Sequence, residues 1–319
     1  MGEFDRITIM KSLINSILTV FIGIFALAQV PVCAQQVRQT VRDELPAFSR
    51  IVLGGDFSLN IQYGKQYRAR MGVEELFNEY VQFSVNDSTL TVSMDERKVP
   101  AEVRKLFRGS GRTPEFRIEV TMPETLRSLR LDGRASLVAA DDLVFDPSSV
   151  SVQVTDNARI ASATLESKRV ELDVDKKAQV TLEVSCDSLI VRQGGNSNLE
   201  VTHHAVASRF EAGANASLLV KGETGLLKLD GRGFSKSILN GKAPVMRCRA
   251  GGAAQVNAVS LESAQAFAEM SGMGAVLTTA ATEDLTVDLS GGATVYFLND
   301  PSIHVLYLKN ASLIPYDRK

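Results

Sequence analysis

Hydrophobic and polar positions repeat at a fixed spacing over the C-terminal part of the chain. Each unit has apolar residues at positions 0 and +2, a small residue at +8 and an apolar residue at +10, as in Val150, Val152, Ala158 and Ile160. A constant period of this kind is typical of repeat architectures. Full or partial copies begin at residues 150, 170, 189, 210, 227, 246, 267, 285 and 303, which gives a period near 19 residues.

The spacing inside each unit predicts strands. Apolar residues recur at every second position, which is the period of a β-strand, whereas helical solenoids repeat every 33 to 47 residues or so. Corners such as Asp156-Asn157 and Gly194-Gly195 separate the strands. With this repeat, each strand pairs with the equivalent strand of the next unit, about 4.8 Å away. The sequence therefore predicts an all-β parallel β-helix. The alternative is an antiparallel β-sandwich with an accidental periodicity.

The small residue at +8 has a packing reason. Stacked coils place the same position of every unit in one interior column, and Ala, Ser or Gly there leaves room for the larger side chains of the opposite walls.

Residues 45–124 follow a different pattern and are expected to form an N-terminal β-rich cap before a β-helix over residues 125–319. Solenoids need such caps at their ends. Asn86-Asp87-Ser88 is the turn of a predicted hairpin, and residues 73–79 are compatible with one or two helical turns. Strands are expected within residues 48–63, 81–85, 90–92 and 116–122.

The N-terminal residues resemble a sorting signal. Residues 13–28 are apolar and uncharged, Lys11 precedes them, and Val32 and Ala34 fit positions −3 and −1 of signal-peptidase cleavage. The apolar run is shorter than the roughly 20 residues that span a bilayer. We therefore predict a signal peptide over residues 1–34 and an exported protein without a membrane span after cleavage, with a retained anchor as the alternative. The expected location is the periplasm, the outer-membrane surface or the extracellular space.

Three segments of the mature chain carry a family resemblance. Residues 48–64 resemble the opening strand pair, residues 88–92 the hairpin return, and residues 120–135 the step into the coils of the putative auto-transporter adhesin family with a head GIN domain. The resemblance extends over roughly residues 45–319. It implies a secreted, right-handed parallel β-helix, and it implies no catalytic residues.

Charge and composition exclude several function classes. The chain has 35 Lys and Arg against 37 Asp and Glu, so no overall basic field exists to bind nucleic acid. Trp is absent and aromatic residues make up 6%, which supplies few stacking platforms for sugars or bases. With 3 Cys and 3 His in all, we expect neither a metal centre nor another cofactor.

Candidate catalytic groups do not converge. Asp173 and Asp175 share one strand face but point to solvent, opposite to the inward Leu172. Asp132 and Asp230, in the two Leu-Asp-Gly-Arg segments, are 98 residues apart, which is too many coils for one substrate. His203 and His204 are adjacent and point to opposite faces of a strand. The sequence therefore predicts a protein that is not an enzyme.

A disulfide between Cys186 and Cys248 is not expected. The two residues are 62 positions apart, or about three coils. At the usual strand spacing this separation is roughly 14 Å, whereas a disulfide needs Cα atoms within about 7 Å.

Residues 97–112 of the expected cap form a strongly basic segment, in which Glu102 is the only acidic residue. It is a candidate contact for anionic lipid or polysaccharide, or simply a solvated loop with a short helix. Its cations are Arg97, Lys98, Arg104, Lys105, Arg108 and Arg112.

These observations favour a secreted, non-enzymatic β-helix that acts as an adhesin or cell-envelope binding module. The partner is unknown, and a surface glycan or an envelope protein would fit. The alternatives are a polysaccharide-active β-helix enzyme and a structural envelope protein without a specific ligand.

Overall fold

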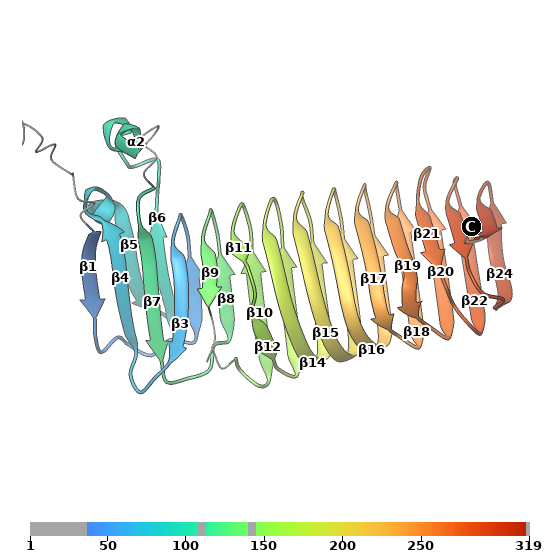
Figure 1. Cartoon of the computed structure of the whole chain (residues 1–319), viewed down its shortest axis with the longest axis horizontal. Helices are drawn as coiled ribbons and strands as arrows, with labels where there is room; N and C mark the ends of the chain where they lie inside the picture. The colour runs from blue at the N-terminus through green and yellow to red at the C-terminus, as the bar shows by residue number, and fades with distance from the viewer. Residues whose placement is uncertain (1–36, 108–112, 140–144, 317–319) are drawn as a thin grey trace, which may run out of the picture. The chain divides into compact units, whose positions relative to one another are not determined.

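Parallel strand pairing, one coil upon the next, dominates the chain. The computed structural model describes residues 37–107, 113–139 and 145–316, and the predicted signal peptide lies outside this part. The model is 63% strand and 5% helix and forms a β-solenoid of about 10 turns of ~19 residues. This confirms the predicted all-β parallel β-helix (Figure 1).

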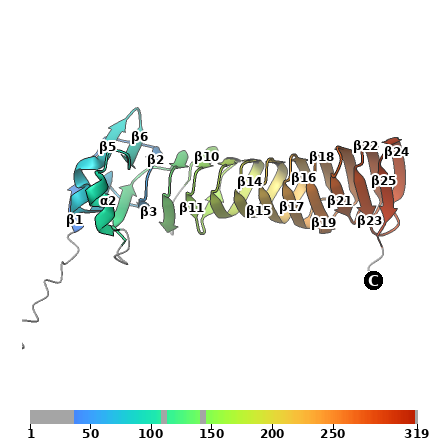
Figure 2. The same ribbon diagram turned by 90° about the horizontal axis from the view of Figure 1, so that it is seen from above.

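Each coil has two flat sides joined by a turn and a bend, as the view from above shows (Figure 2). Face 1 contains β2 (Arg50–Leu53), β6 (Thr89–Met94), β8 (Ser128–Leu131), β10 (Ser149–Val154), β13 (Arg169–Val174), β18 (Val245–Gly251), β20 (Gln265–Ser271), β22 (Asp284–Ser290) and β24 (Ser302–Lys309). Face 2 contains β3 (Ser58–Tyr63), β7 (Phe116–Met122), β9 (Ser136–Ala139), β11 (Arg159–Ile160), β17 (Lys236–Lys242), β19 (Gln255–Glu262), β21 (Val276–Thr279), β23 (Thr294–Phe297) and β25 (Ser312–Pro315). The long strands β14 (Gln179–Gln193), β15 (Asn198–Ala212) and β16 (Ser217–Gly231) run from face 2 around the bend to face 1, and β12 (Thr164–Glu166) lies at the bend.

The strand register confirms the repeat and corrects two of its starting points. Position 0 is an inward column made of Val150, Val170, Leu189, Ser208, Leu227, Met246, Ala266, Leu285 and Ile303. The starts predicted at Phe210 and Phe267 are therefore wrong by two residues and one residue. Ser208 and Ala266 occupy the inward positions, and neither is large and apolar enough to be recognised from the hydrophobic pattern.

The shift has opposite consequences for the two aromatic residues. Phe210 takes the next inward position, between Val191 and Leu229, and is fully buried. Phe267 aligns with Arg247 and Thr286 and lies on the outer surface of face 1. Two alanines, Ala266 and Ala268, fill the interior in its place.

The core lies between the two faces and continues from coil to coil. Val, Leu and Ile dominate the inward columns, and the predicted small-residue column is fully buried at Ala158, Ala178, Ser197, Ala254 and Ala293. The turn from face 1 to face 2 passes through a left-handed residue in successive coils, such as Asp156, Lys176, Gly195, Ala214 and Gly233. Gly and Asp favour this conformation, whereas Lys176 and Ala214 adopt it because the stacked neighbours fix the turn.

Residues 50–122 build layers of the same stack in an order that differs from the chain order. β2 and β3 lie between two neighbouring pairs of strands: β2 pairs with both β6 and β8, and β3 with both β7 and β9, all in parallel. The predicted hairpin is confirmed as β5 (Val81–Asn86) and β6. β4 (Arg68–Glu74) pairs antiparallel with β7, and β1 (Val37–Arg42) pairs with β4. The described residues include two short helices, the 3-10 helix η1 (Glu75–Tyr80) and α2 (Ala101–Phe107).

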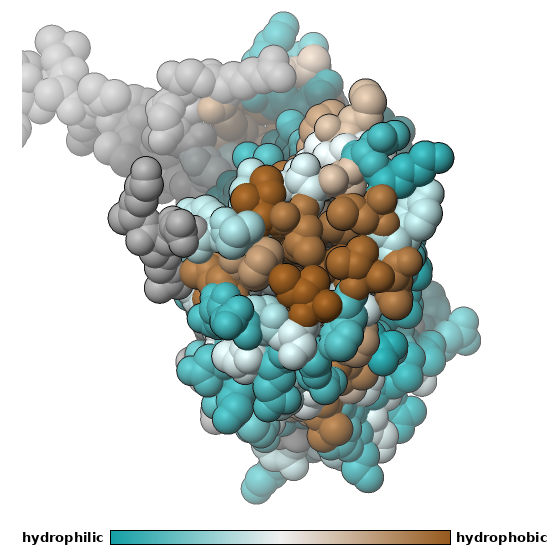
Figure 3. Space-filling model, turned by 90° about the vertical axis from the view of Figure 1, so that its right-hand side faces the viewer, coloured by the Kyte–Doolittle hydropathy of each residue, from teal (hydrophilic) through white to brown (hydrophobic). Residues whose placement is uncertain are grey.

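The last coil presents apolar side chains to solvent (Figure 3). All eight residues of β24 are exposed, and Leu306 is the most exposed of its apolar residues at 72%. A register shift between β22 and β24 leaves Leu306 as the extra residue between Val305 and Tyr307, with no aligned partner on β22. β25 ends in Pro315, a residue that cannot donate a backbone hydrogen bond to a further strand.

Both cysteines of the described coils are free, as predicted. Cys248 is buried at an inward position of face 1, and Cys186 is half-buried at the bend.

Candidate functional site

The outward positions of face 1 form two parallel columns of side chains. The alternation of a strand points every second residue outward, and the parallel register stacks these residues from coil to coil. We call the first the ladder column; it consists of Arg130, Gln153, Asp173, Arg192, Glu211, Asp230, Arg249, Glu269 and Asp288. The second contains three consecutive cations, Arg209, Lys228 and Arg247, which we call the basic column.

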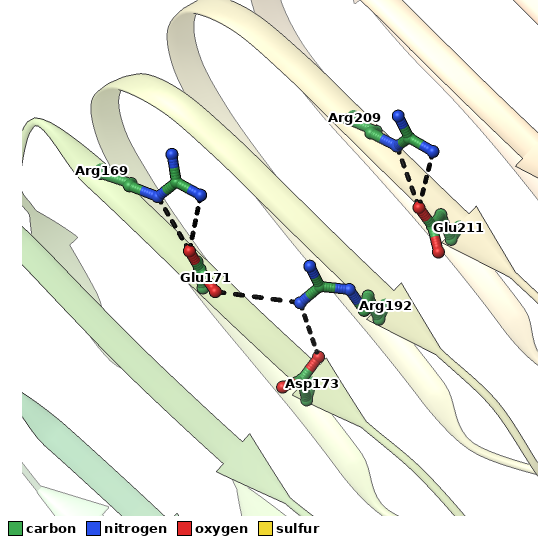
Figure 4. Close-up of polar contacts among 6 residues, drawn as sticks. All are labelled: Arg169, Glu171, Asp173, Arg192, Arg209 and Glu211. Carbon is green, nitrogen blue, oxygen red and sulfur yellow. Dashed lines mark hydrogen bonds and ion pairs between the residues drawn. The ribbon is translucent and has the colours of Figure 1, made fainter.

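Ion pairs connect neighbouring rungs of face 1 (Figure 4). Arg192 approaches Asp173 at 3.4 Å and Glu171 at 3.8 Å on the preceding coil. Arg169 contacts the same Glu171 at 2.7 Å. Pairs of opposite charge directly across a sheet stabilise it, although exposed pairs contribute only about 0–1 kcal/mol each. The charges of the ladder column therefore serve mainly to pair neighbouring coils with one another.

The basic column departs from this arrangement. Arg209 lies directly opposite Lys228, and Lys228 lies directly opposite Arg247, each on the next coil. Arg209 is paired within its own strand to Glu211 at 2.9 Å. The Arg247 guanidinium lies 5.0 Å from the centre of the Phe267 ring. Among the residues that the structure describes, neither Lys228 nor Arg247 has a carboxylate partner.

A groove of about 430 Å³ runs over the basic column. Its apolar part is formed by Phe267 and the exposed Leu306, and its polar part by the basic column and flanking ladder residues. Two of the flanking carboxylates are already paired, Asp230 with Arg232 at 3.0 Å and Glu269 with Arg249 at 2.7 Å. The groove can therefore offer Lys228 and Arg247 to an anion and the Phe267 ring to an apolar surface.

The cations next to the groove stay charged over the physiological range. The pKa of Arg249 is raised above its ordinary value because its hydrogen bond to Glu269 stabilises the charged form. The pKa of Arg232 is raised in the same way by its hydrogen bond to Asp230.

The acidic residues considered as catalytic candidates lie in structural pairs. Asp132 accepts a hydrogen bond from Arg130 at 2.8 Å, and Asp230 accepts one from Arg232 at 3.0 Å. Asp173 lies outward on β13, opposite to the buried Leu172 and Val174 as predicted.

The histidines are placed apart from one another. His203 is 4% exposed, and its Nδ1 lies 3.0 Å from the Lys221 carbonyl oxygen. Burial lowers the pKa of His203 below its ordinary value. His204 is exposed, and Nε2 of His304 lies 3.2 Å from a carboxylate oxygen of Asp284. Within the described ranges, no group of three His, Cys, Asp or Glu side chains could hold a metal ion.

The basic segment predicted as an anionic-surface contact is only partly described. Arg97 is 92% exposed and pairs with Asp95 at 3.1 Å, and Lys98 is exposed beside it. Arg104 and Lys105 lie exposed on α2, whose Phe107 ring packs 5.4 Å from Phe77. Arg108 and Arg112 lie outside the described residues. The role of this segment stays a prediction.

Sequence reasoning missed the groove because of the register at Phe267. The predicted repeat start at Phe267 assigned its ring to the interior. Without an aromatic ring beside it, the basic column is indistinguishable from an ordinary solvated row of charges. A comparison of outward positions at the observed spacing of 19 or 20 residues would have aligned Arg209, Lys228, Arg247 and Phe267.

One protein-family model matches most of the chain. The family model described as "Putative auto-transporter adhesin, head GIN domain" matches residues 47–301. No curated protein matches the chain in sequence.

Three solved structures similar to the chain come from the genus Parabacteroides. A putative adhesin from Parabacteroides distasonis shares 14% identity at a TM-score of 0.45. A putative lipid binding protein from the same species shares 14% identity at a TM-score of 0.48. A putative adhesin from Parabacteroides merdae shares 12% identity at a TM-score of 0.45. Each match covers 89% of this chain and 98% of the other.

Proposed function

Since the chain belongs to the putative auto-transporter adhesin, head GIN domain family, we propose that it is an exported binding protein that catalyses no reaction and presents face 1 to its partner. The family description supports an adhesin role and export. None of the described helices is long and apolar enough to cross a membrane.

The observation that carries the proposal is the groove over the basic column. Its cations come from strands of the coil stack, which hold them at fixed register, so the surface is organised before any partner arrives. Organisation in the free state lowers the entropic cost of binding. Two of the flanking carboxylates, Asp230 and Glu269, are occupied by arginines in ion pairs, an arrangement that favours recognition over acid–base chemistry.

The partner we favour is a glycan of the cell envelope or of a surface that the cell meets. The lack of Trp removes the usual stacking platforms, so charge must supply a large part of the affinity. The segment with Arg97, Lys98, Arg104 and Lys105 is a second candidate contact for an anionic surface.

A glycan array combined with a reducing-sugar assay tests the proposal. We expect saturable binding of a subset of glycans with no release of new reducing ends. Release of reducing ends would replace binding with hydrolysis. If the chain bound no glycan but bound an envelope protein specifically, the partner would be a protein rather than a glycan.

A further inference from the structure

We propose that the groove over Lys228, Arg247 and Phe267 binds an extended acidic polysaccharide whose carboxylates follow the basic column from coil to coil. The inference rests on the proposed function, because it names the ligand class of the same face. It goes beyond that function in assigning the residues and the direction of binding.

The basic column carries an energetic cost in the free protein. Like charges directly opposite each other on neighbouring strands destabilise a sheet. At two successive pairs of coils, Arg209 with Lys228 and Lys228 with Arg247, the fold accepts this cost. The ladder column next to it alternates in sign at Asp173, Arg192 and Glu211. It also places Glu211 opposite Asp230, but each of these carboxylates has an arginine partner, Arg209 and Arg232 respectively. A bound polyanion would convert the repulsion into attraction.

Two of these cations are left for a ligand. Lys228 is exposed and has no ion-pair partner within the described part of the chain. Arg247 is exposed and lies against the Phe267 ring, which fixes its guanidinium plane without neutralising its charge. A guanidinium held in this way can bind a carboxylate with two parallel hydrogen bonds, whereas Lys228 offers a point charge.

The charge of the groove is asymmetric along the coil stack. Asp230 and Glu269 are paired with Arg232 and Arg249, so they add little negative charge to it. Asp288 is exposed at the β22 side of the groove and has no ion-pair partner among the described residues. An acidic ligand is therefore repelled by Asp288 on β22 and attracted by the basic column. We place it over β15, β16 and β18, with one end at Phe267 on β20.

The geometry favours a linear polysaccharide among the acidic ligands. Successive cations are separated by one strand spacing, about 4.8 Å, which is close to the rise of one sugar unit in an extended chain. Phe267 offers an apolar surface to the C–H face of a sugar ring. Nucleic acid fits poorly, because the chain as a whole has a net charge of −2.

The experiment uses the full chain and two matched probes. The first probe is an oligogalacturonate, which carries one carboxylate on every sugar. The second is the same oligomer with its carboxylates methyl-esterified, so that only the charge differs. A sulfated oligosaccharide forms a third arm, which separates recognition of carboxylate from recognition of sulfate. Isothermal titration at low and high ionic strength gives the affinities.

The variant Lys228→Gln/Arg247→Gln is compared with Lys236→Gln/Lys242→Gln, which removes the same charge from exposed positions of β17. We expect oligogalacturonate to bind the wild-type chain, to bind far more weakly at high salt, and to lose about tenfold in affinity for each cation removed from the groove. The β17 variant keeps the wild-type affinity. Phe267→Ala weakens binding but leaves the salt dependence unchanged.

Two results would overturn the inference. One is equal affinity for the acidic and esterified oligomers, and the other is an unchanged affinity in Lys228→Gln/Arg247→Gln. In either case, binding of another glycan or of a protein without turnover leaves the proposed function standing. Cleavage of the oligomer would remove the proposed function itself.

Discussion

Replacing Gly222 with alanine tests the coil geometry at the bend between the two faces. Gly222 lies within β16 and has a φ of 120°, a backbone conformation that side chains rarely allow. A Cβ atom there would lie 1.9 Å from the carbonyl oxygen of His203 on the preceding coil. The obstacle is backbone, so no rotamer change removes it. Gly241 repeats the arrangement on the next coil, with a φ of 115° and the same 1.9 Å approach to Gly222.

The cost follows from two terms. The unfavourable φ contributes about 1–3 kcal/mol. Relief of the overlap requires two coils to separate locally, which loses about 1 kcal/mol for each backbone hydrogen bond that breaks. We expect Gly222→Ala to lower the free energy of unfolding by about 3–4 kcal/mol, a large part of the 5–15 kcal/mol typical of a protein.

Urea unfolding followed by circular dichroism measures the loss. The matched control is Gly213→Ala, because a Cβ at Gly213 would meet its nearest neighbour, the Gln193 carbonyl oxygen, at an ordinary 3.8 Å. The control should stay within about 0.5 kcal/mol of the wild type. Equal stability of the two variants would refute the reasoning.

Three further predictions concern buried side chains. Phe210→Ala should lower the free energy of unfolding by about 3–5 kcal/mol in the same assay, because Phe210 is 0% exposed. The lowered pKa of His203 means that the unfolded chain binds its proton more readily. Stability should therefore fall as the pH drops below the ordinary histidine pKa, and a His203→Gln variant should show a flatter profile in urea titrations at several pH values. Burial raises the pKa of the Cys186 and Cys248 thiols to about 11 and about 12. Both should react slowly with a maleimide at neutral pH and rapidly in urea, as mass spectrometry of the labelled chain can show.

The coil architecture could be predicted because its determinants are local and repeated. Alternation of apolar residues defines the strands, and a column such as Ala158, Ala178 and Ser197 repeats the same packing problem in every coil. Free Cys186 and Cys248 followed from the same spacing argument.

The order of the N-terminal layers could not be predicted in this way. Leu53 aligns with both Leu131 and Val92, so the first strand of face 1 has a neighbour on each side. The hydrophobic pattern predicts strands within residues 45–124, but it contains no information about which of two equally apolar strands lies on which side.

The candidate site depended on register, which hydrophobicity alone determines poorly where the interior residues are small. Ala266 and Ala268 bury little apolar surface, so the larger Phe267 between them was taken for the core residue. The coils on either side force the opposite assignment, because Met246 and Leu285 continue the inward column through Ala266.

The most direct test of the account is hydrogen–deuterium exchange of the full chain with and without oligogalacturonate, combined with an assay for reducing ends. We expect slower exchange confined to the face 1 segments of β15, β16, β18 and β20, and no release of sugar. Protection limited to residues 97–107 or to face 2, or the appearance of new reducing ends, would contradict it.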